Sequence, residues 1–149
     1  MTITCLILRP EPGATATAAR VEAAGARAVR APLFSYRPVS WSLPDPTPAI
    51  VMLTSAAAPR LAGPQLARLI DRPCYVVGGA TAAAARAAGF TRITKAGPDI
   101  HALLARLARD GVGEVLHLCG REHREVEHPA TRIVRVIVYA ADAADRLPD

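Results

Sequence analysis

Short apolar, β-branched segments alternate with alanine-rich segments along most of this chain, and the alternation limits the folds it can adopt. Runs rich in Val, Ile and Leu and bounded by Pro or Gly are typical of buried strands, whereas runs of Ala, Leu and Arg favour helices. The expected strands are residues 2–8, 28–31, 33–37, 49–53, 75–77, 92–95, 114–118 and 133–139. The expected helical segments are 14–24, 56–58 continuing through 66–70, 80–88 and 100–108. This order predicts an α/β fold, with a parallel sheet flanked by helices and right-handed crossovers.

The clearest strand–turn–helix unit runs from Tyr75 to Phe90. Gly78 and Gly79 follow the strand and allow a sharp turn, and Gly89 ends the alanine-rich helix that comes next. Such a turn presents free backbone N–H groups and the positive end of a helix, where an anionic ligand can bind. A Gly-Gly pair also serves simple tight packing of a strand against a helix, and both interpretations stay open at this point.

Composition excludes several classes of protein. At 149 residues and 51% apolar content the chain can bury a core, yet no apolar run approaches the roughly 20 residues that span a bilayer. The N-terminus lacks the pattern of a signal peptide, so no membrane association is expected. The three cysteines, Cys5, Cys74 and Cys119, lie on or beside apolar segments and are expected to be free thiols. These features favour a cytoplasmic protein.

The net charge of +5 comes mostly from arginine. The arginines are scattered singly, without Lys/Arg runs or interleaved aromatic residues, so no nucleic-acid partner is expected. Scattered arginine is typical of an ordinary surface, and it also suits a site for a phosphate or polycarboxylate ligand.

Other patterns that carry chemistry are weaker. The stretch 122–132 contains His123 and His128 among glutamates, but it is interpreted as a solvated loop, and no metal is expected. His117 lies in an apolar strand and is expected to be a core histidine with its hydrogen bonds satisfied. Ser55 lacks the flanking glycines of a nucleophile elbow, and no Ser-His-Asp set is found. A dinucleotide site is disfavoured because the Gly78-Gly79 turn lacks a third glycine.

Several polar or glycine-containing segments follow the expected strands directly. In open α/β sheets, ligands bind beyond the carboxyl ends of the strands. The segments in that position are Arg9, Thr54-Ser55, Gly78-Gly79 and Gly120-Arg121. Because parallel strands end at one edge, Thr54, Gly78 and Gly120 are expected near the same edge of a single sheet.

A succession of short motifs across nearly the whole chain resembles the uroporphyrinogen-III synthase family. The motifs are Leu8-Arg9-Pro10, Ala31-Pro32-Leu33, Leu53-Thr54-Ser55-Ala56, Val77-Gly78-Gly79-Ala80-Thr81-Ala82, Ala88-Gly89-Phe90, Leu118-Cys119-Gly120-Arg121 and Val138-Tyr139. The resemblance implies two α/β domains joined by a two-stranded linker, with the active site in the cleft between them.

The resemblance also implies domain bounds. Residues 1–31 would be a fragment of the first domain, and 32–139 a flavodoxin-like second domain with crossing strands at 33–37 and about 133–139. Residues 140–149 would lead back to the first domain, whose C-terminal part this shortened chain would lack. The apolar face of the N-terminal segment would then need a partner, so it is expected either to pack on the chain's own second domain or to associate or exchange with another copy.

The chemistry implied by the resemblance is that of a lyase without a cofactor. It cyclises the linear tetrapyrrole hydroxymethylbilane to uroporphyrinogen III and inverts the last pyrrole ring. Tyr139 would be catalytic, as a hydrogen-bond donor that assists departure of the hydroxyl group. The substrate-binding residues would be Arg9, Thr54, Ser55, Gly78, Gly79, Ala80, Thr81, Gly120 and Arg121. On its own the chain is expected to be inactive, and the alternative is a non-catalytic α/β module that binds a small anionic ligand or a partner protein.

Overall fold

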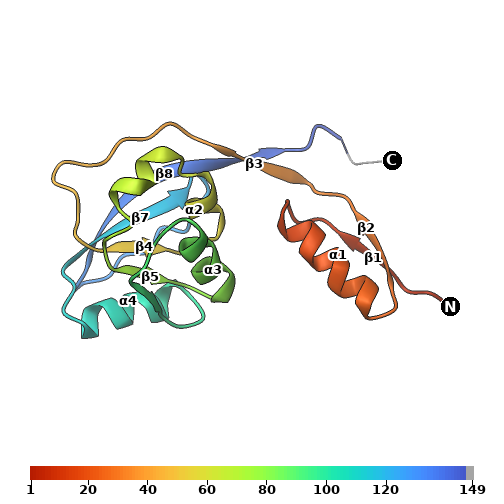
Figure 1. The fold of residues 1–149 in the computed structure, drawn as a ribbon, viewed down its shortest axis with the longest axis horizontal. Helices are drawn as coiled ribbons and strands as arrows, with labels where there is room; N and C mark the ends of the chain where they lie inside the picture. Colours follow the sequence, from red (N-terminus) through yellow and green to blue (C-terminus); the bar gives the residue numbers. More distant parts are fainter. Residues whose placement is uncertain (147–149) are drawn as a thin grey trace. The chain divides into compact units, whose positions relative to one another are not determined.

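The computed structural model describes residues 1–146, which form two compact units (Figure 1). Unit 1 comprises residues 1–37 together with the chain from Ala141 onwards, and unit 2 comprises residues 38–140. The chain passes from one unit to the other twice, within two strands that are neighbours in one sheet. Residues 147–149, the end of the predicted tail, lie outside the described residues.

A mostly parallel sheet of six strands organises unit 2 and confirms the predicted fold class. In spatial order the strands are β3 (Phe34–Pro38), β8 (Arg132–Ala143), β7 (Glu114–Gly120), β4 (Val51–Leu53), β5 (Cys74–Val76) and β6 (Ile93–Lys95). The pairs β8–β7, β7–β4, β4–β5 and β5–β6 are all parallel. The carboxyl ends of these five strands therefore lie at one edge, as the sequence predicted for Thr54, Gly78 and Gly120.

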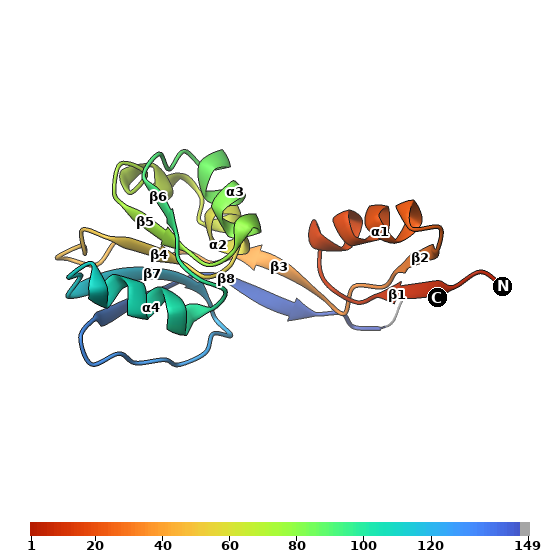
Figure 2. The same cartoon turned by 90° about the horizontal axis from the view of Figure 1, so that it is seen from below.

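Helical segments cover both faces of this sheet (Figure 2). They are α2 (Ala57–Leu61), the 3-10 helix η1 (Pro64–Arg68), α3 (Gly79–Ala87) and α4 (Ile100–Arg109). The chain moves from β4 outward to β5 and β6, and then returns across the sheet to β7. Because parallel crossovers are right-handed, this reversal places α4 on the face opposite α2 and α3. The point of reversal, between β4 and β7, is the topological switch point of the sheet.

The prediction of a regular helix at residues 66–70 was wrong. The segment is a 3-10 helix that begins earlier, at Pro64, which lacks an N–H and suits the first position of a helix. Gly63 precedes it at φ +73°, a backbone conformation that favours glycine. The segment is only five residues long and follows the turn at Gly63, and such short segments often form 3-10 hydrogen bonds instead of α-helical ones.

The core of the α4 face consists of aliphatic side chains from the helix and the strands beneath it. Leu103, Leu104 and Leu107 of α4 contact Met52 of β4 and Val115 of β7, and all five side chains are fully or almost fully buried. The leucines recur at helical spacing, which explains why α4 was predictable from sequence. The helix begins with a side-chain cap, in which the Asp99 carboxylate accepts a hydrogen bond from the N–H of Ala102 at 2.9 Å.

Unit 1 contains a two-stranded parallel sheet, β1 (Thr4–Ile7) and β2 (Arg27–Arg30), and one helix, α1 (Gly13–Ala23). Ile7, Ala14, Ala18 and Ala28 form its small core. Among the described residues of unit 1, these large apolar side chains remain exposed: Met1, Ile3, Leu6, Leu8, Val29 and Leu33. A two-stranded sheet is marginally stable by itself, so this surface is a structural liability.

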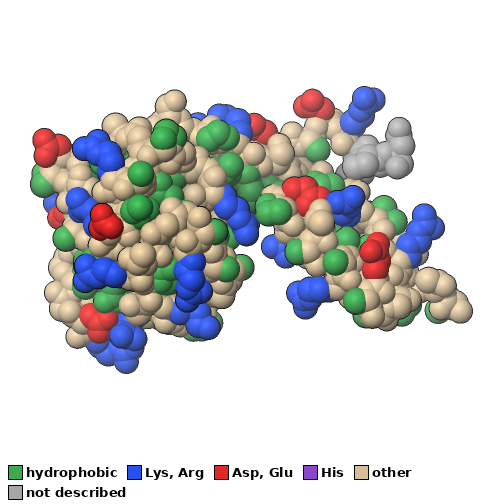
Figure 3. Space-filling model, in the orientation of Figure 1, with side chains coloured by type: hydrophobic (Ala, Val, Ile, Leu, Met, Phe, Trp, Pro, Cys, Tyr) green, Lys and Arg blue, Asp and Glu red, His purple; other side chains and the backbone are tan. Residues whose placement is uncertain are grey.

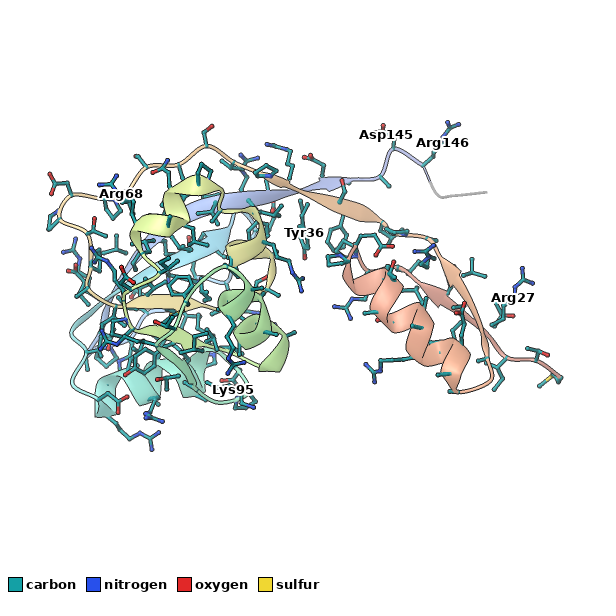
Figure 4. All side chains as sticks on the ribbon, in the orientation of Figure 1. Arg27, Tyr36, Arg68, Lys95, Asp145 and Arg146 are labelled. Atoms are coloured by element: carbon teal, nitrogen blue, oxygen red, sulfur yellow. The ribbon has the colours of Figure 1, made fainter. Side chains whose placement is uncertain are left out.

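Basic side chains are dispersed over both units. On the face drawn in Figure 3 the lysine and arginine side chains stand apart from one another and are interspersed with acidic ones. Figure 4 shows Arg27, Arg68 and Lys95 projecting from β2, η1 and β6 respectively. None of the helices among residues 1–146 is long and apolar enough to cross a membrane.

Candidate functional site

A cavity of about 300 Å³ opens in unit 2 at the carboxyl ends of β4 and β7. This is the topological switch point, where open α/β sheets bind their ligands. Its wall includes Thr54 after β4, His117 and Gly120 of β7, and Tyr139 of β8. The start of α4 and the loop after β7 complete the wall, with Asp99, Ile100, Glu122, His123 and Arg124.

The ring of Tyr139 fits directly against the backbone of Gly120. The two residues are partners in the β7–β8 ladder, and a register irregularity precedes them at the Cys119/Gly120 step. A Cβ atom added at Gly120 would stand 2.7 Å from the Cε2 and Cζ atoms of the tyrosine ring and 3.0 Å from its hydroxyl oxygen. The N–H of Arg121 also donates to the carbonyl oxygen of Tyr139 at 2.9 Å. Glycine at position 120 therefore sets the place of the tyrosine ring in the cavity wall.

Thr54 is coupled to a buried histidine. Its Oγ1 lies 3.0 Å from Nε2 of His117, which is only 1% exposed. Burial, together with the charges of the nearby Arg135 and His123, lowers the pKa of His117 from its ordinary value of 6.5 to about 3. The imidazole is therefore neutral at physiological pH.

The prediction that His117 is a satisfied core histidine was wrong in one respect. The side chain is buried as expected, but its Nδ1 has no hydrogen-bond partner within the described part of the chain. It also lines the cavity instead of lying in a closed core. A buried polar atom without a partner is costly, and such atoms in native proteins call for an explanation.

The loop that follows β7 is held against the sheet, and it is not helical, as predicted. Nδ1 of His123 lies 3.0 Å from the carbonyl oxygen of Gly120, and Nη2 of Arg135 donates to the carbonyl oxygen of Val126. Val126 packs against the core on the α4 face. These contacts keep the loop in place as one wall of the cavity.

Cys119 contributes a neutral thiol to the cavity wall. Burial raises its pKa to about 11 and that of Cys74 to about 12, so neither is a reactive thiolate. Among residues 1–146 no three His, Cys, Asp or Glu side chains gather into a group able to hold a metal ion. His128 instead accepts a hydrogen bond at Nδ1 from the N–H of Ala130.

The predicted site residues separate into two groups. Thr54, Gly120 and Tyr139 meet at the cavity. The others do not line it: Ser55 accepts a hydrogen bond from the N–H of Ala57 at the start of α2, and Arg121 is exposed. Arg9 lies in unit 1, where its Nη1 donates to Oγ1 of Thr17.

The glycine turn after β5 lies beside the cavity and not in its wall. Gly78 adopts φ +79° before α3, as the predicted sharp turn requires. Gly79 and Ala80 are exposed and Thr81 is buried, while the preceding Val77 is the residue of this segment that reaches the cavity. The N-terminus of α3 is therefore available at the same sheet edge, next to the cavity.

Sequence reasoning missed the loop and helix residues of the wall. Asp99, Ile100, His123 and Arg124 carry no motif, and they reach the cavity only because α4 and the loop after β7 cover the same face. The helix-cap pattern at Asp99 predicts the start of α4, which lies at the same edge of the sheet as the strand ends.

Together these features define a doubly wound α/β protein whose candidate site lies at the switch point of its sheet. The chain belongs to the uroporphyrinogen-III synthase family, whose model matches residues 15–144. The family consists of lyases of porphyrin biosynthesis.

A solved structure is similar in fold. It is the crystal structure of uroporphyrinogen-III synthetase from Helicobacter pylori, with a TM-score of 0.61 and 18% sequence identity. The match covers 98% of this chain and 64% of that chain, so this chain spans less than two thirds of the length of the solved protein. No curated protein is significantly similar in sequence.

Proposed function

We propose that unit 2 supplies one wall of a uroporphyrinogen-III synthase site, which cyclises hydroxymethylbilane with inversion of the last pyrrole ring. The observation that carries this proposal is the convergence of Thr54, Gly120 and Tyr139 on one cavity at the switch point of the sheet. These residues come from three separate family motifs, on β4, β7 and β8.

The cavity is large enough for only one part of the substrate. About 300 Å³ is at the low end of the range of roughly 300–1,000 Å³ found for small-molecule sites. A four-ring chain with acetate and propionate groups on every ring is far larger. The cavity thus fits one pyrrole ring with its side chains, and the N–H groups at the start of α3 lie beside it and can bind a carboxylate.

We assign unit 1 and unit 2 to the first and second domains of the family.

The roles in the cavity follow from the chemistry of the side chains. The Tyr139 hydroxyl would donate a hydrogen bond to the departing hydroxyl group, and Thr54 would bind an oxygen of the same ring. Holding the terminal ring in the right geometry favours the inverted product over spontaneous closure to the type I isomer.

The three free cysteines are typical of proteins in a reducing compartment, and we propose that the protein is cytoplasmic.

The test of this function is product-isomer analysis with hydroxymethylbilane. Residues 1–149 alone should yield only the spontaneous type I isomer, because they provide one wall of the site. An extended form, which carries the family's remaining sequence after residue 149, should yield type III. Type I alone from both forms would refute the proposed function. Tetrapyrrole binding without cyclisation would favour the alternative of a non-catalytic module.

In the extended form, Tyr139→Phe should lower the rate of type III formation by about tenfold, the cost of one hydrogen bond in the transition state. The phenylalanine ring keeps the packing on Gly120, so the position of the ring should be retained. The matched control is Tyr75→Phe, which removes a hydroxyl that donates to Asp110 at 2.7 Å, outside the cavity. Equal rates for Tyr139→Phe and wild type would remove the tyrosine from the mechanism.

We also propose that two copies of this chain associate through the exposed apolar face of unit 1. Leu6 and Val29 are partners in the β1–β2 ladder and are 60% and 36% exposed, so they present one apolar patch. Leu6→Lys should shift the 149-residue chain toward monomer in sedimentation velocity, because a charge in an apolar interface is costly. Ala19→Lys is the control: it is an exposed position on α1, which packs on the other face of the β1–β2 sheet, so it should leave the dimer intact. A wild-type chain that is monomeric at high concentration would contradict this proposal.

A further inference from the structure

Two buried side-chain nitrogens lack a hydrogen-bond partner in the described part of the chain, and one of them belongs to a residue of the cavity wall. They are Nδ1 of His117 and Nε of Arg135. The two residues are partners in the parallel ladder of β7 and β8, so their side chains leave the sheet on the same face. Met52 is the ladder partner of His117 on β4, and Thr54 follows two residues later on that face.

The donor on Arg135 favours one of the two neutral tautomers of the His117 imidazole. The Nε–H of Arg135 is a donor, since guanidinium has no acceptor atoms. The two nitrogens do not bond to each other directly, but a lone pair on Nδ1 of His117 would complement that donor and its positive charge through one bridging water molecule. A proton on Nδ1 would instead place two N–H donors and a cation together. This arrangement favours the neutral tautomer protonated at Nε2, the nitrogen that faces Thr54.

This tautomer determines what the threonine hydroxyl can do. With the proton on Nε2, the imidazole donates and Oγ1 of Thr54 accepts at 3.0 Å. The hydroxyl hydrogen of Thr54 is then not used toward the histidine and can be donated to a ligand. With the opposite tautomer Thr54 would donate to the imidazole and could only accept from a ligand. The difference decides whether the site binds an oxygen anion.

We propose that His117 is a positioning residue that holds the Thr54 hydroxyl as a hydrogen-bond donor toward a carboxylate or hydroxyl oxygen of the ligand in the cavity. Arg135 sets the tautomer from the far side of the imidazole and at the same time secures the loop that walls the cavity, through Val126. This inference rests on the proposed function for the identity of the ligand, but its geometry belongs to the 149-residue chain alone.

The first test is the protonation state of His117 in the 149-residue chain, read from its imidazole ¹⁵N and ¹H resonances. The proton should reside on Nε2 at neutral pH. Thr54→Val keeps the shape of the side chain and removes the acceptor, so it should move the Nε2 proton resonance upfield and speed its exchange with water. Arg135→Met, which removes the charge and the donor, should shift population toward the Nδ1-protonated form. A wild-type imidazole protonated at Nδ1 would overturn the proposal.

The second test is a double-mutant cycle on type III formation in the extended form. Thr54→Val and His117→Phe should each lower kcat/KM by about tenfold, the cost of one hydrogen bond. The double variant should be no slower than Thr54→Val, because His117 acts through Thr54. His117→Gln, whose side-chain amide can donate to Thr54, should recover part of the loss. Multiplying effects, or a glutamine variant as slow as the phenylalanine variant, would overturn the proposal.

The two tests separate this inference from the proposed function. If the wild-type extended form makes no type III isomer, the proposed function fails, while the resonances of His117 still decide the tautomer. If type III is made and the imidazole is protonated at Nδ1, the function stands and the role given to His117 is wrong.

Discussion

Acidification should destabilise the wild-type chain more steeply than a variant without the buried histidine. The pKa of His117 is about 3 in the folded protein and about 6.5 when the side chain is solvated. Between these values the unfolded chain binds a proton that the folded chain does not, so stability falls as pH falls. The contribution is complete above pH 6.5 and is lost toward pH 3, at about 1.4 kcal/mol per pH unit.

The measurement is urea unfolding of the 149-residue chain at pH 7 and at pH 4.5. His117→Phe and His117→Gln should each lose about 3 kcal/mol less than wild type over this range, because neither side chain titrates there. Leu118→Ala is the control, since it removes a buried side chain next to His117 and should lower stability at both pH values equally. Parallel pH profiles for wild type and both histidine variants would contradict the burial of a neutral imidazole.

Gly120→Ala should abolish most of the proposed activity with a smaller effect on folding. The new Cβ would lie 2.7 Å from the ring of Tyr139, closer than carbon atoms approach, so the ring must move. In a reaction controlled by geometry, a shift of about 1 Å costs on the order of a hundredfold in rate. The overpacking itself should lower the free energy of unfolding by about 1–3 kcal/mol.

Type III formation by the extended form gives the rate, and the ring resonances of Tyr139 in the 149-residue chain report its displacement. The control is Gly113→Ala, just before the same strand, where an added Cβ meets no atom within 4 Å. That variant should keep both the rate and the tyrosine resonances. A Gly120→Ala protein with normal activity and unmoved resonances would show that the ring is not held by this contact.

Much of the fold was predictable because hydrophobic periodicity and glycine turns are local signals. The parallel sheet, α4 and the turn at Gly78 all follow from them. The extension of β8 to Ala143 was not predictable, since its last residues are alanine and aspartate, with low strand propensity. Their extended conformation comes from pairing with β3, a contact between residues about a hundred positions apart.

The candidate site was predictable to the extent that it consists of motif residues at strand ends. Thr54, Gly120 and Tyr139 were found in this way. The unpaired nitrogen of His117 was not, because a histidine in an apolar strand gives the same sequence pattern whether its partners are complete or absent. Only the ladder register with Arg135 and the approach of Thr54 show what surrounds the imidazole.

Unit 2 is inserted in the chain between the two segments of unit 1, and the pairing of β3 with β8 holds the ends of this insertion together. The chain enters unit 2 at Pro38 and leaves it at Ala140, and the N–H of Val39 donates to the carbonyl oxygen of Val138 at 3.0 Å. Once unit 2 has folded, the two ends of the chain emerge side by side. Unit 2 is a long loop between the two segments of unit 1, and the entropy lost on closing a loop rises with its length. Folding of unit 2 closes this loop first, so the segments of unit 1 can then meet without that entropic cost. An inserted domain whose two ends lie next to each other can also be inserted into other proteins without distorting the domain that receives it.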